Sequence, residues 1–536
     1  MSVRQYSGYG KGDSYIMNTT GTAPLFLCGI DVGTTGTKTM IFALDGTLQG
    51  KAYREYSCSY PKPGWVEQDI DMVLAEAFSS CREALERSGI RPGQVAAVAL
   101  STQRTTSIFL DQEERVLKTI SWQDNRTGNE LKEIERKTGK DGFYEMTGLP
   151  LNTTWIITKI LWMQKNEPDT WKKVRRIVQV QDYFLRRLGA DDFYIDYPDA
   201  CLYGCFDSAG HQWKDELLDI AGIDRRLLPL PTPCGTMVGK VSREAAALTG
   251  LAEGTPICVG AGDQNSASIG AGITEQGMIS VSLGTGGMAI ACMDYPYRDP
   301  KASACVTCHA ITGYYQFEGY QIGAASVFRW YRDELGYAER VEAERKNTDI
   351  YELLNEKIKQ VPPGAKGLIM LPYFGSAASP RWNPEARGTL LGLTFAHDRA
   401  CVARACMEGI TMEQKDILTN MKENQIPIKS VRIIGGATNS KIWNQMQADM
   451  YRLPCDTLAV EDAAVIGAAL MGGAAVGIFS DIREGVRNMI KVKEHYEPKP
   501  ETADLYDEMY GIYCRAYESL EQGRVFEKIS EFQSRY

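Results

Sequence analysis

Two turns rich in glycine and threonine stand about 250 residues apart in this chain, Asp31-Val-Gly-Thr-Thr-Gly-Thr-Lys38 and Ser282-Leu-Gly-Thr-Gly-Gly287. Small residues leave backbone N–H groups accessible, and these groups together with threonine hydroxyls are the donors that a phosphate needs. Apolar, strand-like segments flank both turns, whereas a Walker A loop or a dinucleotide-binding turn opens a helix. The pair therefore predicts two loops that hold one polyphosphate from opposite sides, with a plain hairpin turn as the alternative for either loop alone.

Two carboxylates stand at the ends of predicted strands near these turns. Asp263 follows an apolar strand among small residues and is placed to accept the proton of an alcohol that receives a phosphoryl group. The alternative for Asp263 is an Asx cap of the helix that follows it. Asp31 directly precedes the first turn, where it could hold Mg²⁺ directly or through water beside the phosphates. A third strand end, Gly435-Gly-Ala-Thr-Asn439, offers a surface without bulky side chains that suits an adenosine.

Polar and aromatic residues cluster in three further segments, Gly64–Glu67, Gln103–Thr106 and Trp122–Arg126. Planar donors, a carboxylate and an indole suit a polyhydroxylated ligand, and a salt-bridged surface is the alternative. The segment Cys305-Val-Thr-Cys308-His309 matches the attachment pattern of a c-type haem. We expect a strand there instead, because that attachment requires export to an oxidising compartment and residues 1–24 lack the apolar core of a signal peptide.

The length and composition of the chain limit the number of domains and the kinds of partner that these residues can serve. A chain of 536 residues with 44% hydrophobic content predicts two or three domains. A net charge of −9 argues against a nucleic-acid or membrane-surface partner. Fourteen cysteines without a secretory signal predict reduced thiols in the cytoplasm. The most apolar stretch, residues 463–479, is short for a membrane span and rich in Gly and Ala, so it predicts a buried helix.

Strands and helices alternate along the first half of the chain. Periodicity predicts strands at 94–100, 106–110 and 116–121 and helices at 71–88, 155–164 and 174–188. In the second half it predicts a charged helix at 340–360, helices from 399 to 422 and a strand at 430–434. A domain boundary is expected near residues 250–260.

An ordered set of motifs resembles the FGGY family of carbohydrate kinases over about residues 25 to 515. Besides the two turns, the set comprises Ala261-Gly-Asp-Gln264, Ser379-Pro-Arg-Trp-Asn-Pro-Glu-Ala-Arg-Gly388, Arg404-Ala-Cys-Met-Glu-Gly409 and Gly435-Gly-Ala437. The resemblance implies an α/β protein with two ribonuclease-H-like domains of the actin and hexokinase superfamily and an active site in the cleft between them. We expect a flexible extension at 1–24, a sugar-binding domain at 25–257, a nucleotide-binding domain at 258–500 and a helical tail at 501–536.

The resemblance also implies roles for single residues, with ATP as co-substrate and Mg²⁺ as cofactor. Asp263 is then the general base, and Asp31 is the magnesium or phosphate-site carboxylate. The sugar is expected to contact Gln103, Arg104, Thr105, Trp122, Asp124, Asp263 and Gln264. ATP is expected to contact Thr34, Thr35, Lys38, Gly284, Thr285, Gly435, Gly436, Ala437 and Asn439.

The substrate position departs from the best-known members of the family. Glycerol kinases are similar to this chain at Gln103-Arg104 but place Glu where Thr105 stands, and xylulokinases place His there. Losing such a partner removes a hydrogen bond worth about 1.5–3 kcal/mol if charged. We predict a cytoplasmic kinase of a xylulose-like pentulose or another ketose, or of a polyol, that forms a homodimer as many relatives do. Autoinducer-kinase-like or glycerol-kinase-like specificity is the alternative within the family, and an actin-like ATPase switch that phosphorylates no sugar is the alternative of another class.

Overall fold

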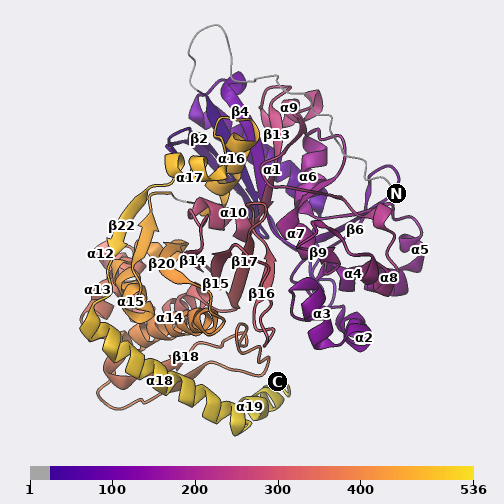
Figure 1. Cartoon of the computed structure of the whole chain (residues 1–536). Coiled ribbons are helices and arrows are strands. Elements are labelled where there is room, and N and C mark those ends of the chain that lie inside the picture. Colours follow the sequence, from indigo (N-terminus) through magenta and orange to yellow (C-terminus); the bar gives the residue numbers. More distant parts are fainter. Residues whose placement is uncertain (1–24, 461) are drawn as a thin grey trace.

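A computed structural model describes residues 25–460 and 462–536, which form two lobes (Figure 1). The expectations for residues 1–24 lie outside the described residues. Each lobe is built around one large mixed sheet. The predicted two-domain α/β architecture is therefore confirmed.

The sheet of the first lobe has the strand order β12-β13-β4-β1-β2-β3. Strands β1, β2 and β3 form an antiparallel meander, and β4 and β13 run parallel to β1 on its other side. The bounds are Phe26–Val32 for β1, Gly36–Ala43 for β2, Leu48–Glu55 for β3, Val95–Thr102 for β4, Met237–Lys240 for β12 and Pro256–Gly262 for β13. Because β13 pairs within this sheet, the boundary expected between residues 257 and 258 divides a strand of the first lobe.

The sheet of the second lobe, in the order β16-β17-β15-β14-β20-β21-β22, repeats this plan. Strands β14, β15 and β17 form the meander, and β20 and β21 run parallel to β14 on its other side. The bounds are Gly277–Leu283 for β14, Gly287–Met293 for β15, Cys305–Cys308 for β16, Tyr315–Gln321 for β17, Ile428–Ile434 for β20, Cys455–Leu458 for β21 and Val492–Tyr496 for β22. Both glycine-threonine turns thus connect the first two strands of a meander, as the flanking apolar segments predict.

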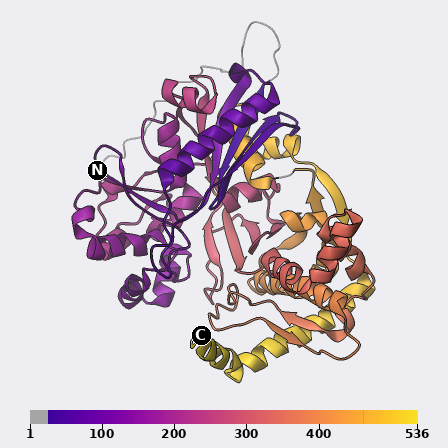
Figure 2. The same ribbon diagram turned by 180° about the vertical axis from the view of Figure 1, so that it is seen from behind.

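Helices cover both faces of the first sheet. Helices α1 (Ile70–Ser88) and α6 (Val180–Leu188) pack on one face, which Figure 2 shows from outside. On the other face lie α10 (Asp263–Gly270) and α16 (Ala463–Ala475). The apolar stretch from residue 463 is therefore a buried helix, as predicted, and it belongs to the core of the first lobe. No helix of the described residues is long and apolar enough to cross a membrane.

The second lobe buries its sheet beneath the long helix α14 (Arg399–Glu423) and helix α18 (Pro500–Gln522). Helix α18 inserts Tyr506, Tyr513 and Tyr517 into this core, so it is packed as part of the lobe. The other helices of the lobe are α11 (Ala325–Trp330), α12 (Tyr337–Lys346), α13 (Ile350–Lys359), α15 (Lys441–Tyr451) and α19 (Val525–Gln533). Helix α17 (Ile482–Met489) packs instead on α16 and contributes Met489 to the core of the first lobe.

Two predicted helices are wrong in extent. The helix expected at 340–360 is two helices, because Asn347 adopts a left-handed conformation that ends α12 and Asp349 caps α13. The helix expected at 174–188 begins only at Val180. Residues 176–178 instead form strand β7 (Arg176–Val178), which pairs with β5 (Ser107–Leu110) and is therefore extended.

A smaller subdomain extends the first lobe on the side of the cleft. It contains β5, β6 (Val116–Ile120) and β7 with helices α2 (Gly128–Thr138), α3 (Lys140–Thr147), α4 (Ile156–Asn166), α5 (Pro168–Trp171), α7 (Tyr197–Cys201) and α8 (Asp215–Ala221). Two short strand pairs accompany it, β8 (Tyr194–Asp196) with β11 (Leu230–Thr232) and β9 (Phe206–Asp207) with β10 (Gln212–Trp213). Helix α9 (Arg243–Thr249) packs on α1. In the second lobe, β18 (Ile369–Leu371) pairs with β19 (Thr389–Leu391).

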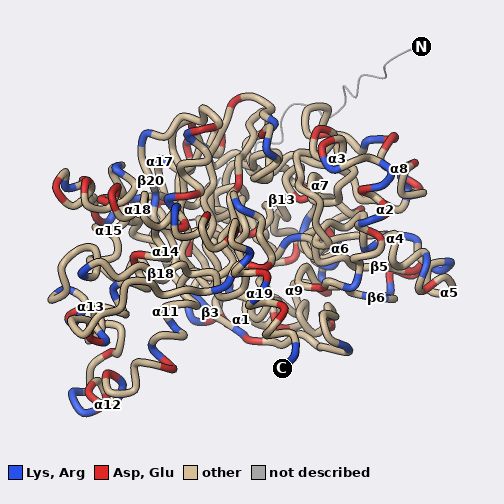
Figure 3. Tube along the Cα trace, turned by 90° about the horizontal axis from the view of Figure 1, so that it is seen from below, with Lys and Arg blue, Asp and Glu red and all other residues tan. Residues whose placement is uncertain are grey.

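Hydrogen bonds join this subdomain to the second lobe. The Tyr144 hydroxyl donates to the Ala304 carbonyl at 3.0 Å, and the Val306 N–H donates to the Gly148 carbonyl at 2.8 Å. Acidic and basic residues are interspersed along both lobes (Figure 3). The negative net charge is therefore distributed over the chain and not gathered in one segment.

Candidate active site

A cavity of about 420 Å³ lies between the two lobes. The first lobe contributes Thr34, Arg104 and Trp122 to its wall, and the second lobe contributes Glu318 and other residues. Further lining residues are Thr105, Asn152, Thr154, Trp155, Leu202, Asp263, Gln264, Met288, Cys305, Tyr320, Ile322, Ser376, Ala377, Ala378, Trp382 and Pro384. The cavity is large enough for a small polyhydroxylated molecule, and its few polar side chains include Arg104, Asp263 and Glu318.

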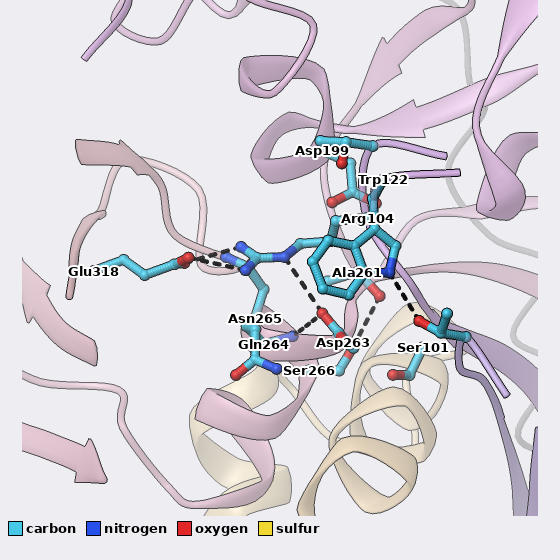
Figure 4. Close-up of polar contacts among 12 residues, drawn as sticks. Ser101, Arg104, Trp122, Asp199, Ala261, Asp263, Gln264, Asn265, Ser266 and Glu318 are labelled. Carbon is cyan, nitrogen blue, oxygen red and sulfur yellow. Dashed lines mark hydrogen bonds and ion pairs between the residues drawn. The ribbon is translucent and has the colours of Figure 1, made fainter. Parts of the chain in front are cut away.

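Asp263 stands on the cavity wall where β13 ends and α10 begins (Figure 4). The chain can bring it there because the preceding residue is Gly262, at which a Cβ would lie 2.4 Å from Asp199 Oδ1. The carboxylate accepts a hydrogen bond from the Gln264 N–H at 2.7 Å, and its Oδ1 lies 3.3 Å from Arg104 Nε. Burial raises the pKa of Asp263, and the Arg104 guanidinium acts in the opposite direction. The first residue of α10 is thus a carboxylate that faces the cavity, and the N-cap is Gly262.

Arg104 bridges the two lobes. Its Nη1 and Nη2 donate to the two carboxylate oxygens of Glu318 at 2.9 and 2.8 Å. Glu318 lies on β17 of the second lobe and accepts a further hydrogen bond from Gln316 Nε2 at 3.0 Å. Sequence reasoning missed Glu318. Its one local signal is a charged residue in the otherwise uncharged strand Tyr315-Gln-Phe-Glu-Gly-Tyr-Gln321.

The first glycine-threonine loop, between β1 and β2, is closed by a hydrogen bond from the Gly33 N–H to the Gly36 carbonyl at 3.0 Å. Trp122 Nε1 donates to Thr34 Oγ1 at 2.8 Å, which fixes the indole beside the loop. Thr35 is exposed at the loop tip. The loop therefore joins the predicted nucleotide side of the site to the predicted sugar side.

The second loop, between β14 and β15, closes in the same way, with the Gly284 N–H donating to the Gly286 carbonyl at 3.0 Å. Thr285 is exposed, and its Oγ1 accepts a hydrogen bond from Arg329 Nη2 at 3.3 Å. Gly435 lies against this loop, because a Cβ there would be 2.8 Å from the Leu283 carbonyl oxygen. The neighbouring Gly436 and Asn439 are exposed, whereas Ala437 is buried.

A group of carboxylates stands beside the first loop. Asp31 accepts a hydrogen bond from Ser101 Oγ at 2.6 Å, and Lys38 Nζ lies 2.6 Å from Asp462 Oδ2. Burial and the neighbouring Asp462 carboxylate raise the pKa of Asp31 to about 8. A divalent cation would relieve this repulsion. Magnesium characteristically uses one or two carboxylates with phosphate oxygens and water, so Asp31 fits it although the described residues contain no cluster of three ligating side chains.

Two residues expected to contact the sugar do not line the cavity. Asp124 is fully buried, where it accepts hydrogen bonds from the Val66 N–H and from Arg126. Arg126 also lies 3.8 Å over the Trp65 ring. Gln103 is buried and donates to Gln68 Oε1 at 2.9 Å. Both side chains are thus engaged by partners within the first lobe, whereas Arg104, Thr105, Trp122 and Gln264 line the cavity as expected.

Lys159 is a second residue that sequence reasoning missed. Its ammonium nitrogen is buried and donates to the Thr105 carbonyl at 2.7 Å, while the Thr105 N–H donates to Gln179 Oε1 at 2.6 Å. Thr105 has a φ of 59°, a left-handed conformation that a β-branched residue rarely adopts. Both of its backbone groups are therefore held from behind, which fixes the segment that carries Arg104.

The Cys305–His309 segment forms strand β16 and its continuation, as expected. All fourteen cysteines are free thiols, and the described residues contain no group of three His, Cys, Asp or Glu side chains that could hold a metal ion.

Comparison with known proteins identifies the relatives of this chain. Residues 26–270 match the N-terminal domain of the FGGY family of carbohydrate kinases, and residues 279–476 match the C-terminal domain of that family. A gluconokinase of Bacillus licheniformis is 27% identical over 92% of this chain and 96% of its own. An autoinducer-2 kinase of Escherichia coli strain K12 is 28% identical over 92% of this chain and 94% of its own.

Solved structures agree with these matches. The xylulose kinase of Rhodospirillum rubrum has a TM-score of 0.83 at 27% identity and covers 94% of this chain and 100% of its own. The predicted fold class, two ribonuclease-H-like domains of the actin and hexokinase superfamily around a cleft, is thereby confirmed.

Proposed function

Because this chain belongs to the FGGY family of carbohydrate kinases, we propose that it phosphorylates a hydroxyl of a small ketose or polyol with Asp263 as general base. The chain is a phosphotransferase with an alcohol acceptor, and ATP is its co-substrate. The relatives differ in the sugars that their names give, so family membership leaves the acceptor open. The observation that carries the proposal is the position of Asp263 on the wall of a cavity to which both lobes contribute.

The acceptor would occupy this cavity with one hydroxyl against Asp263. That carboxylate would take the hydroxyl proton as the hydroxyl oxygen bonds to the γ-phosphorus and the bond from this phosphorus to the bridging oxygen breaks, which releases ADP. Burial supports this role because it makes Asp263 more basic, while Arg104 at 3.3 Å keeps the charged form accessible. Arg104, Trp122 and Gln264 would orient the remaining hydroxyls.

ATP would lie between the two glycine-threonine loops. The exposed Thr35 and Thr285 would contact its phosphates, and the exposed strand end at Gly435–Asn439 would accept the adenosine. We propose that Asp31 holds Mg²⁺, which would offset the negative charge of the phosphates during transfer. Lys38 is placed by its ion pair with Asp462 to add positive charge at the same end.

A coupled assay of ADP release tests this function. Purified enzyme with ATP and Mg²⁺ is offered pentuloses, hexuloses, tetritols, glycerol and gluconate in turn. At least one acceptor should raise ADP release well above the rate with ATP alone. ADP release that no acceptor changes would support an ATPase switch instead and would contradict the kinase proposal.

Replacement of the base gives a sharper test. Asp263→Asn should keep nucleotide binding and lose acceptor-dependent ADP release by roughly 10²-fold or more. Isothermal titration with ADP serves as the control for an intact nucleotide site. Near-normal turnover by this variant would remove Asp263 from the role of base.

A further inference from the structure

Few charged residues line the cavity, and the negative ones outnumber the positive ones. Arg104 is the one cation among the lining residues that the structure describes, whereas Asp263 and Glu318 are both carboxylates. Figure 4 shows the two carboxylates on different sides of the Arg104 guanidinium. With all three groups ionised, the described wall carries a net charge of −1.

All three nitrogens of the Arg104 guanidinium already face carboxylates of the protein. The fork formed by Nη1 and Nη2 binds the two oxygens of Glu318 at 2.9 and 2.8 Å, and Nε faces Asp263 at 3.3 Å. A bidentate carboxylate is the partner for which this fork is shaped. A carboxylate on a substrate would therefore have to displace Glu318 from it.

Glu318 is held firmly in this position. Gln316 Nε2 donates to its Oε2 at 3.0 Å, and Gln316 Oε1 in turn accepts from Asn265 Nδ2 at 2.7 Å. Only 8% of Glu318 is exposed, so water could not replace the hydrogen bonds of Arg104 if this carboxylate lost them. Protein groups alone therefore satisfy the Glu318 carboxylate.

From this geometry we infer that Glu318 determines the acceptor class of the site. By occupying the fork of Arg104 it excludes sugar acids and selects an uncharged polyhydroxylated acceptor. The selection works by repulsion. A bound sugar acid would add a third negative charge beside Asp263 and the buried Glu318, and it would leave Glu318 without its arginine partner. This inference rests on the proposed kinase function and narrows its substrate.

Steady-state kinetics of the wild-type enzyme provide the first test. The probes are D-gluconate and the uncharged ketoses, tetritols and glycerol of the acceptor panel. We expect kcat/KM for the best uncharged acceptor to exceed that for gluconate by about 100-fold, as the loss of a charged hydrogen-bonded pair would require. Gluconate as the best acceptor would overturn the inference while the kinase function stood. No turnover with any acceptor would overturn the kinase function and this inference with it.

The variant Glu318→Gln provides the second test. Glutamine keeps the size of the side chain and can still accept hydrogen bonds from Arg104, but it removes one negative charge from the wall and leaves Asp263 as the charged partner of the arginine on that wall. The ratio of kcat/KM for gluconate to that for the uncharged acceptor should rise by about tenfold or more.

Two controls accompany the variant. Glu423→Gln removes the same charge from an exposed position of the second lobe and should leave the ratio unchanged. Thermal unfolding and ADP titration establish that Glu318→Gln is folded. Equal loss of activity toward both acceptor classes would show that Glu318 has only a structural role, and the wild-type ratio stands as a test even if the variant does not fold.

Discussion

Buried charges at the site divide into those that face the cavity and those that hold the scaffold. The half-buried Asp263 belongs to the first group, and the fully buried Lys159 belongs to the second because its ammonium donates to the Thr105 carbonyl. A lysine without a carboxylate in contact is costly inside a protein. Its presence indicates that the left-handed conformation of Thr105 requires a strong donor behind it.

Titration of Lys159 should appear in the stability of the protein. Burial lowers its pKa from 10.5 to about 7, although Asp124 opposes this effect and Arg126 adds to it. Below pH 7 the folded protein carries the full cost of a buried ammonium. Between pH 7 and 10.5 the unfolded chain binds more protons than the folded one, so this cost declines as the pH rises.

Lys159→Met removes the titrating group and keeps most of its volume. The stability that the variant gains over wild type, measured as the increase in the free energy of unfolding, should therefore be larger at pH 6 than at pH 9 by about 3 kcal/mol. Urea unfolding at both pH values measures it. Lys132→Met, at an exposed position of α2, is the control and should show no such difference. A difference for Lys159→Met that does not depend on pH would show that the lysine is charged throughout this range.

The sequence predicted which residue types form the site better than it predicted the direction in which each side chain points. Asp263 lines the cavity, where a carboxylate at a strand end among small residues was expected to meet a substrate. Asp124 was misplaced because its segment has the composition of a sugar site, while its side chain turns inward to Val66 and Arg126. Local sequence does not determine which way a loop residue points when its partner lies 58 positions away.

At the scale of elements, the helix that begins with Asp263 is positioned by its packing against α16, where glycines let the two backbones come into contact. Helices α10 and α16 approach so closely that a Cβ at Gly467 would lie 1.9 Å from the Ser266 carbonyl oxygen, and one at Gly270 would lie 1.8 Å from that of Ala463. Composition predicted α16 as a buried, small-residue helix. It could not predict the partner, because α10 lies about 200 residues earlier in the chain.

Gly467→Ala tests whether this packing sets the position of Asp263. The added methyl group must push α10 and α16 apart, which should cost about 2–3 kcal/mol of stability. Because α10 begins at Asp263, acceptor-dependent kcat should fall as well. Urea unfolding and the coupled ADP assay measure the two effects.

A matched control is available in α18. A Cβ at Gly511 would meet nothing within 4 Å. Gly511→Ala should therefore be neutral or stabilising by up to about 1 kcal/mol, since alanine favours a helix more than glycine does. Wild-type stability of Gly467→Ala would mean that the helices can separate without loss and that their contact does not position the base.

At the scale of the whole molecule, the two lobes repeat one sheet plan but carry different residues at the end of the first strand. The meander β1-β2-β3 of the first lobe corresponds to β14-β15-β17 of the second, and both glycine-threonine loops close with the same kind of backbone hydrogen bond. The end of the first strand carries Asp31 in one lobe and Ser282 in the other. The repeated plan thus gives each lobe one such loop, and Asp31 is the carboxylate that we propose for Mg²⁺.

The contact between lobes was the part of the site least accessible to sequence reasoning. The strands, both loops and the buried helix followed from periodicity and composition, which are local properties. Arg104 and Glu318 are separated by 214 positions, and neither segment carries a signal for the other. Their pairing exists only because the two sheets face each other across the cavity.

A cysteine on the cavity wall makes occupancy of this space measurable. Cys305 is half-buried on β16 of the second lobe and lines the cavity opposite Arg104 of the first. Burial raises the pKa of the Cys305 thiol, so its alkylation should be slow and should depend on access through the cavity. An acceptor bound between the lobes would cover it.

We therefore expect the best acceptor of the panel, at about ten times its Kd, to slow iodoacetamide labelling of Cys305 by roughly tenfold, which is the factor set by the unoccupied fraction. Peptide mass spectrometry over a time course measures the labelling rate at each cysteine. Cys514 is half-buried on α18, outside the cavity, and its burial also raises its thiol pKa, so its labelling rate should not change. Equal slowing at Cys514 would indicate general stabilisation of the protein, and unchanged labelling of Cys305 would place the acceptor outside this cavity.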